Sequence, residues 1–198
     1  MQKMGVYVPV HAVVAALAEK YETEAAHLMS VLLSVYVMTG CDTASFPWHI
    51  GKRRAFRLAT ENFEELTPIV RYGQPGEDLH VAEDVMDAAR HLFKSLYERS
   101  NFGGFLDALR AHLFTHTKGR GIRCLPPTED AFRLHVLRSF QQMAVVKQAH
   151  LSEPVILAST DYERELMNGK LVAKMMLKPP KPLHSNACLL YTSPSPRD

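Results

Sequence analysis

Apolar residues recur at spacings of three and four along most of this 198-residue chain. That spacing is typical of amphipathic helices, because it places the apolar side chains on one face of the helix. Strands are expected only before the first and after the last of these helical segments, over residues 6–10 and 171–177. The predicted helices span residues 11–21, 24–38, 52–60, 62–70, 79–99, 105–114 and 129–148. We therefore predict a mainly α fold.

The segment from Thr39 to Ala55 is the most informative about function. An apolar helix leads into Asp42 at a Gly-Cys turn, and a second helix begins after Gly51 with three cations at positions 52–54. A carboxylate can bind Mg²⁺. The exposed N–H groups of a helix N-terminus bind phosphate, and nearby cations favour the same ligand. The segment therefore predicts a metal-dependent activity on nucleic acid.

The same segment resembles the flap-endonuclease class of the PIN-like nuclease superfamily. In that class an apolar helix ends in Gly-Cys-Asp or Gly-Ser-Asp, and Gly-Ile-Gly and Pro-Lys-Arg-Ala follow at a fixed distance. Here Gly40-Cys41-Asp42 is followed, after a six-residue loop, by His49-Ile50-Gly51 and then Lys52-Arg53-Arg54-Ala55. The resemblance implies the C-terminal, helix-rich part of an α/β PIN-like domain. Such a part contains a helix–two-turn–helix element, and a helical extension follows it here.

Site residues follow from this resemblance. It makes Asp42 a catalytic residue and a Mg²⁺ ligand. Gly51 is expected at a tight turn, where a side chain would keep the backbone away from phosphate. His49 departs from the Gly of the class, and Lys52 departs from its Pro. The residues expected to bind the phosphate backbone of DNA or RNA are His49, Ile50, Gly51, Lys52, Arg53, Arg54 and Arg57.

One carboxylate cannot hold the two Mg²⁺ ions that two-metal phosphodiester cleavage uses. The superfamily supplies its other acids from upstream strands that this chain lacks. We therefore expect a catalytically inactive fragment of a Mg²⁺-dependent nuclease. Two alternatives stay open, a non-catalytic nucleic-acid-binding module and a helical interaction scaffold. Asp42 on its own is also compatible with a helix cap or an Asx-turn.

A wider pattern links this segment to the second half of the chain. The run Gly-Cys-Asp-Thr-x-Ser at 40–45, followed by Leu-Pro-Pro-Thr at 125–128, resembles metazoan proteins that are found with mobile elements. His135 and Arg138 follow on the next predicted helix. A second basic patch is predicted from Lys118, Arg120, Arg123, His135 and Arg138. For His135, a packed structural histidine is an equally expected alternative. For the cations of 52–57, the alternative is a solvated helix face.

The chain is expected to be an interior fragment with four parts. Residues 1–73 are assigned to the PIN-like domain, 74–150 to the helical extension and 151–187 to a partly extended tail. The last residues, 188–198, resemble a translated sequencing adapter and are expected to be disordered.

Composition limits the partners. The formal net charge is only +2, so nucleic-acid binding has to come from local clusters. The longest apolar stretch, 28–38, is shorter than the roughly 20 residues of a membrane span. Outside the adapter-like tail there are two separated cysteines, which is typical of a reducing compartment. We expect an intracellular protein, nuclear or cytoplasmic, with no membrane association.

Overall fold

The computed structural model describes residues 8–41, 44, 45, 47, 50–74, 81–97, 102–116, 122–155 and 157–174, and of Arg123 the backbone alone. The helices are α1 (Val10–Lys20), α2 (Ala25–Met38), α3 (Lys52–Glu61), α4 (Glu83–Leu96), α5 (Leu106–His116) and α6 (Glu129–Lys147). The 3₁₀ turns η1 (Thr67–Arg71) and η2 (Ile122–Cys124) lie between helices. A third, η3 (Ser159–Asp161), follows α6 and precedes a hairpin of β1 (Arg164–Met167) and β2 (Lys170–Ala173). The prediction of a mainly α fold is confirmed.

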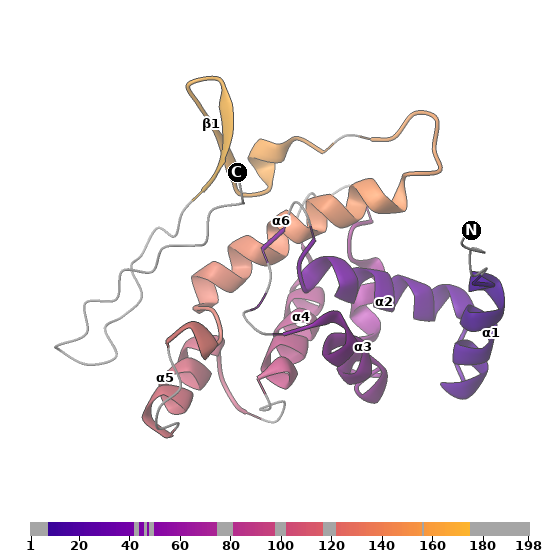
Figure 1. The fold of residues 1–198 in the computed structure, drawn as a ribbon. Coiled ribbons are helices and arrows are strands. Elements are labelled where there is room, and N and C mark those ends of the chain that lie inside the picture. The colour runs from indigo at the N-terminus through magenta and orange to yellow at the C-terminus, as the bar shows by residue number, and fades with distance from the viewer. Residues whose placement is uncertain are drawn as a thin grey trace, which may run out of the picture.

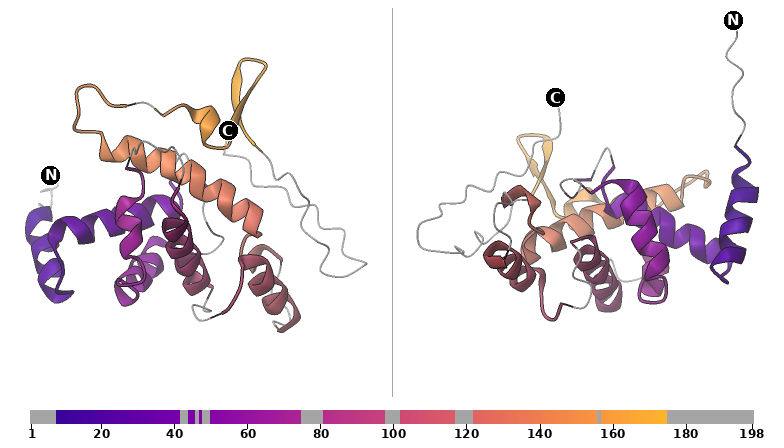
Figure 2. Two further views of the ribbon diagram at one scale, coloured as in Figure 1. Left: turned by 180° about the vertical axis from the view of Figure 1, so that it is seen from behind. Right: turned by 60° about the horizontal axis from the view of Figure 1, so that its bottom comes forward.

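The long helix α6 lies between the β-hairpin and the other helices (Figure 1). The hairpin is on one side of α6, and helices α2 to α5 are on its other side. The view from behind in Figure 2 shows the same division. Helix α1 stands at one end of the molecule and contacts α2. Within α1 only Ala18 is buried, while Val14 and Leu17 are half-buried and Val13 is exposed.

The turn after η1 fixes α6 against the preceding helices. Tyr72 is fully buried, and its hydroxyl donates to the carbonyl oxygen of Val136 at 2.5 Å. Gly73 has a φ of +74°, and a Cβ atom there would lie 2.7 Å from the backbone of Met143. A glycine is therefore required for this close approach to α6. The chain before position 73 and the chain after it both contribute residues to one hydrophobic core.

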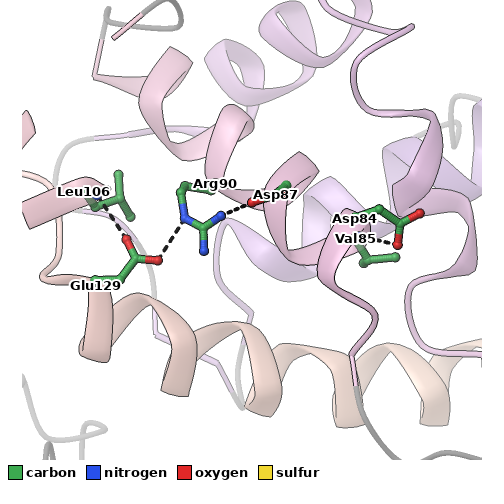
Figure 3. A network of polar contacts seen from close by, with 6 residues as sticks. All are labelled: Asp84, Val85, Asp87, Arg90, Leu106 and Glu129. Carbon is green, nitrogen blue, oxygen red and sulfur yellow. Dashed lines mark hydrogen bonds and ion pairs between the residues drawn. The ribbon is translucent and has the colours of Figure 1, made fainter. Parts of the chain in front are cut away.

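Glu129 and Arg90 hold the starts of α5 and α6 against α4 (Figure 3). The Nε of Arg90 donates to Oε1 of Glu129 at 2.8 Å, and its Nη1 pairs with Asp87. The other carboxylate oxygen of Glu129 accepts the N–H of Leu106, the first residue of α5, at 3.0 Å. In return, Asp107 accepts the N–H of Glu129 at 3.1 Å. Each helix start is therefore capped by a carboxylate of the other helix, where the helix dipole favours negative charge.

Two predicted elements differ from the structure. The predicted strand at 6–10 is wrong at its end, because Val10 is the first residue of α1, while residues 1–7 lie outside the described part of the chain. The apolar run at 62–70 is not a continuous helix. Asn62 ends α3 with its side-chain amide donating to Leu58 O at 2.8 Å, and Pro68 then lies in the 3₁₀ turn η1. Proline fits the first turn of a helix because it lacks an N–H group.

The predicted strand at 171–177 is present over 171–173 as part of β2, and residues 175–177 lie outside the described part of the chain. Its partner β1 was not predicted. The two strands are antiparallel, with Leu166 opposite Leu171. Asn168 and Gly169 connect them with φ values of 50° and 75°. Two successive positive φ values are the geometry of a tight hairpin turn, and Asn-Gly is its preferred sequence.

Candidate nucleic-acid interface

Helix α3 places two alanines inward and two arginines outward. Ala55 and Ala59 are fully buried on the side of α3 that meets α2 and α4. Arg53 and Arg57 lie on the opposite side, one helical turn apart, and both are exposed. Arg57 makes an exposed ion pair with Glu61 at 3.6 Å. The small inward side chains let α3 pack closely while its cations face solvent.

The first turn of α3 concentrates positive charge where the helix dipole is already positive. Its N-cap, Gly51, has no side-chain acceptor, and the turn contains no acidic residue. Within the described residues the N–H groups of Lys52 and Arg53 have no acceptor, whereas those of Arg54 and Ala55 bond to Gly51 O at 3.1 and 3.2 Å. Cations at a helix N-terminus are unfavourable by about 0.3–1 kcal/mol each. An anion at this turn would relieve that repulsion.

Lys52 does not share the outward direction of Arg53. Its Nζ donates to the carbonyl oxygens of Tyr36 and Gly40 and to Thr39 Oγ1 at 3.2 Å. It also lies 4.1 Å from the centroid of the Tyr36 ring. Partial burial lowers the pKa of Lys52. The amine therefore caps the C-terminus of α2, and the prediction of Lys52 as a phosphate contact is replaced by a positioning role.

Gly51 does not adopt the tight-turn conformation that was predicted. Its φ of −84° and ψ of 157° are extended values that any residue adopts. A Cβ atom at this position would have no neighbour within 4 Å. The fold itself therefore does not require glycine here. What glycine provides is open space at the start of α3.

The segment that leads to Asp42 is held at the start of α3. Gly40 follows the end of α2 with a φ of 102°, and its carbonyl oxygen accepts from Lys52. Cys41 and Ala44 exchange two backbone hydrogen bonds of 3.2 and 3.1 Å. Asp42 itself lies outside the described residues, as does His49. The half-buried Ile50 packs against the hydrophobic core.

Ser45 and His135 bring the two halves of the wider sequence pattern together. The Ser45 hydroxyl lies 2.9 Å from Nδ1 of His135, and Nε2 of His135 lies 2.7 Å from the carbonyl oxygen of Met38. Because the carbonyl only accepts, Nε2 carries the proton and Nδ1 accepts from the serine. Burial is the main cause that lowers the pKa of His135 to about 4, and the charges of Arg138 and Lys52 lower it further. His135 is therefore neutral at pH 7, as in the alternative of a packed structural histidine.

The second predicted basic patch is described in part. Lys118 and Arg120 lie outside the described residues, and the side chain of Arg123 is not described either. Arg138 is half-buried on α6, where its Nε donates to Leu134 O at 3.1 Å. Burial first, and then the charge of Arg164, lower the pKa of Arg138. Arg164 belongs to the hairpin, and the chain before the hairpin contacts α6 through the stacked rings of Tyr162 and Phe140.

The described residues do not fit a magnesium site. No group of three or more His, Cys, Asp or Glu side chains is close enough to hold a metal ion in the described ranges. His112 and His116, which have a metal-binding spacing, stack with ring centroids 4.2 Å apart. Nδ1 of His116 lies 2.9 Å from the carbonyl oxygen of His112. These two histidines therefore form a pair at the C-terminal end of α5.

Comparison with known proteins adds no relative. No family model, no curated protein and no solved structure matches this chain. The resemblance to PIN-like nucleases therefore stays a prediction. Across the described ranges, no helix has both the length and the apolar character needed to cross a membrane.

Sequence reasoning missed three features of the site. The inward direction of Lys52 had no signal, because it depends on where the end of α2 lies. Ser45 was part of a quoted motif but had no assigned role. Arg164 was missed with β1, although the Asn168-Gly169 pair is a recognisable hairpin signal.

Proposed function

We propose that this chain binds the phosphate backbone of a nucleic acid through the N-terminal half of α3. The observation that carries the proposal is the uncapped N-terminal turn, with Arg53 and Arg57 exposed beside it. N–H groups at a helix start and guanidinium groups are both good partners for phosphate oxygens. Such contacts position a nucleic acid without reading its sequence. Binding is therefore expected to depend on salt and not on base sequence.

Lys52 supports this function indirectly. By holding the carbonyl oxygens of Tyr36 and Gly40, it fixes the start of α3 to the end of α2. The buried alanines of α3 fix the same helix from the side. A rigid support keeps the N–H groups and the arginines in a constant arrangement, which lowers the entropy cost of binding.

Nuclease ancestry is a second proposal, and it rests on the resemblance of residues 40–55. The supporting observation is that Gly40 and Cys41, just before Asp42, are held at the start of α3. Asp42, which lies outside the described residues, follows this segment directly in the chain. Because one carboxylate, Asp42, cannot hold the two Mg²⁺ ions of two-metal phosphodiester cleavage, we propose binding without cleavage for this chain. Mg²⁺-dependent cleavage of a duplex or a flap, lost in Asp42→Asn, would contradict the non-catalytic form of the proposal.

The phosphate-binding proposal is tested with single charge removals. Arg53→Gln and Arg57→Gln should each weaken binding of a fluorescent 20-base-pair duplex by about three- to tenfold at low salt. Lys20→Gln is the matched control, because Lys20 is an exposed cation in the last turn of α1. It should change the affinity by less than about twofold. Equal effects of all three variants would mean that only net charge matters, and the proposal would fail.

A further inference from the structure

Helix α2 exposes apolar side chains and directs polar ones inward. Its 14 residues contain no Asp, Glu, Lys or Arg. Ser34 is fully buried, and the hydroxyl of Ser30 donates to Val70 O in η1 at 3.1 Å. Met29 and Tyr36, by contrast, are 40% and 44% exposed. This distribution is the reverse of that on an ordinary surface helix, where polar and charged residues form the solvent side.

The exposed side chains of α2 form one stripe. Positions 29, 32, 33 and 36 are three and four residues apart, which places them on the same side of the helix. Leu32 and Leu33 are half-buried, and Ala25 extends the stripe by one exposed turn. We call this stripe the α2 face, and it consists of Ala25, Met29, Leu32, Leu33 and Tyr36. A contiguous exposed apolar surface is typical of an interaction site.

The two ends of the α2 face carry opposite charge. Glu24, the N-cap residue of α2, is exposed, and so is Glu22. In the described ranges neither carboxylate has an ion-pair partner. At the other end, the ammonium group of Lys52 lies 4.1 Å from the centroid of the Tyr36 ring and donates to the carbonyl oxygens of Tyr36 and Gly40. The face is therefore acidic at its N-terminal end and basic at its C-terminal end.

We propose that α2 pairs antiparallel with α2 of a second copy of this chain. A two-fold axis between Leu32 and Leu33 brings Leu32 of each copy against Leu33 of the other, and Met29 against Tyr36. The same symmetry places the acidic end of each face at the basic end of the other. A lipid surface would not use both end charges, so a second copy is the favoured partner. The proposal goes beyond phosphate binding and does not depend on it, because the exposed arginines of α3 are not part of the α2 face.

The size of the α2 face predicts a reversible dimer. A helix of 14 residues is about 21 Å long and about 10 Å wide, so the contact is smaller than the roughly 800 Å² per partner of a stable interface. Helix α1 contacts α2 and adds apolar surface, because it lacks Asp, Glu, Lys and Arg from Val10 to Ala18 and exposes Val10 and Val13. We expect a dissociation constant on the order of 10 μM.

Sedimentation equilibrium of the whole chain tests the proposal. The wild type should show a monomer–dimer equilibrium between about 1 and 200 μM. Met29→Lys should raise the dissociation constant by about tenfold or more, because each dimer would then bury two charges. Met167→Lys is the matched control and should dimerise like the wild type, since Met167 is an exposed methionine of the hairpin, on the other side of α6. Circular dichroism should show equal helix content in both variants.

Three results would overturn the dimer. The first is a wild-type chain that stays monomeric over the whole range. The second is an equal effect of Met29→Lys and Met167→Lys. The third is a monomer that binds neutral phosphatidylcholine vesicles and loses this binding in Met29→Lys, which would assign the α2 face to a lipid surface.

Disulfide cross-linking tests the antiparallel register. In the double variant Met29→Cys, Tyr36→Cys, each new thiol lies opposite the other kind in the second copy, and oxidation should give a covalent dimer. Neither single variant should cross-link more than the wild type, because two copies of position 29 lie seven residues, or about 10 Å, apart along the helices. The wild type measures the background from the native cysteines. Cross-linking of a single variant, or none in the double variant, would contradict the antiparallel pairing.

Discussion

The hydroxyl of Ser45 lies 2.9 Å from Nδ1 of His135, although the two residues are 90 positions apart in the chain. His135 is buried in α6, and its other ring nitrogen meets the end of α2 at Met38 O, 2.7 Å away. One neutral imidazole thus links the end of α2, the loop before α3 and the long helix α6. This link holds the candidate interface against the core.

The stability of the fold should depend on the protonation of His135. Its pKa is about 4 in the folded chain against 6.5 for an unperturbed histidine, so the unfolded chain binds more protons between these values. The free energy of unfolding should therefore be constant above pH 6.5 and fall by about 3 kcal/mol as the pH drops to 4. Urea unfolding between pH 4 and pH 7 measures this slope.

His135→Gln should flatten that pH dependence. His150→Gln is the control, because His150 is exposed beyond the end of α6 and should leave the slope unchanged. Identical slopes in the wild type and in both variants would show that the buried imidazole does not control stability at acid pH.

Lys52 should contribute to stability more than its neighbour Arg53. Lys52→Met removes a charged donor from the carbonyl groups at the end of α2 and should lower the free energy of unfolding by about 1–2 kcal/mol. Arg53→Met, at an exposed position in the same turn, should change it by less than about 0.5 kcal/mol. Equal losses in urea unfolding would contradict the inward role assigned to Lys52.

Glu129 should be the most sensitive carboxylate in the first turn of α6. Glu129→Ala leaves the Nε of the buried Arg90 and the N–H of Leu106 without acceptors, although Arg90 keeps Asp87, and should cost about 2–4 kcal/mol of unfolding free energy. Asp130→Ala removes the exposed neighbouring carboxylate and should cost less than about 1 kcal/mol. A small loss for Glu129→Ala would mean that the cross-capping of α5 and α6 is not important for stability.

Alanine substitutions at Gly73 and Gly104 should distinguish the stability cost of a close contact from that of backbone strain. Both have positive φ values, but only Gly73 has neighbours closer than 3 Å to a built Cβ; at Gly104 the nearest is Ala108 at 3.8 Å. Gly104→Ala should cost about 1 kcal/mol from conformation alone. Gly73→Ala should cost about 2–4 kcal/mol, because α6 must also shift away from the turn. Similar losses in the two variants would refute the tight packing at Met143.

The helices were predictable because their signals are local. Apolar spacing predicted α2, α3 and α6 to within a residue or two. Thr128 caps α6, and its side chain accepts from Ala131 N at 3.3 Å. The same reasoning failed for the apolar run at 62–70, because these residues pack into the core from turns and not from a continuous helix. Periodicity reports which residues are buried, and it does not report whether the backbone is continuous.

The candidate site was less predictable, because its decisive contacts are not local. The cations of α3 were identifiable from sequence, but the sequence does not show that Lys52 faces the end of α2 while Arg53 faces solvent. The docking of the chain before the hairpin on α6, where Tyr162 stacks on Phe140, is not encoded by any short pattern. Composition and spacing therefore identified the basic helix, and the fold determined which of its charges are exposed.

Gly51 provides a test in which stability and binding should change in opposite directions. Gly51→Asp places a carboxylate at the N-cap of α3, where it accepts from backbone N–H groups that have no acceptor among the described residues, and should stabilise the fold by up to about 1 kcal/mol. The same carboxylate occupies the proposed phosphate position and should weaken duplex binding by about tenfold or more. Unchanged duplex affinity in a more stable Gly51→Asp protein would show that phosphate does not bind at this turn.

The central claim is that α3 binds nucleic-acid phosphate, and the salt dependence of duplex affinity tests it most directly. The dissociation constant of a 20-base-pair duplex should rise linearly with salt on logarithmic axes for the wild-type chain, by counterion release. In the double variant Arg53→Gln, Arg57→Gln, the slope should be smaller by about two, one for each lost phosphate contact. An identical slope in the wild type and the double variant, or a wild-type chain that binds no duplex at low salt, would contradict the account.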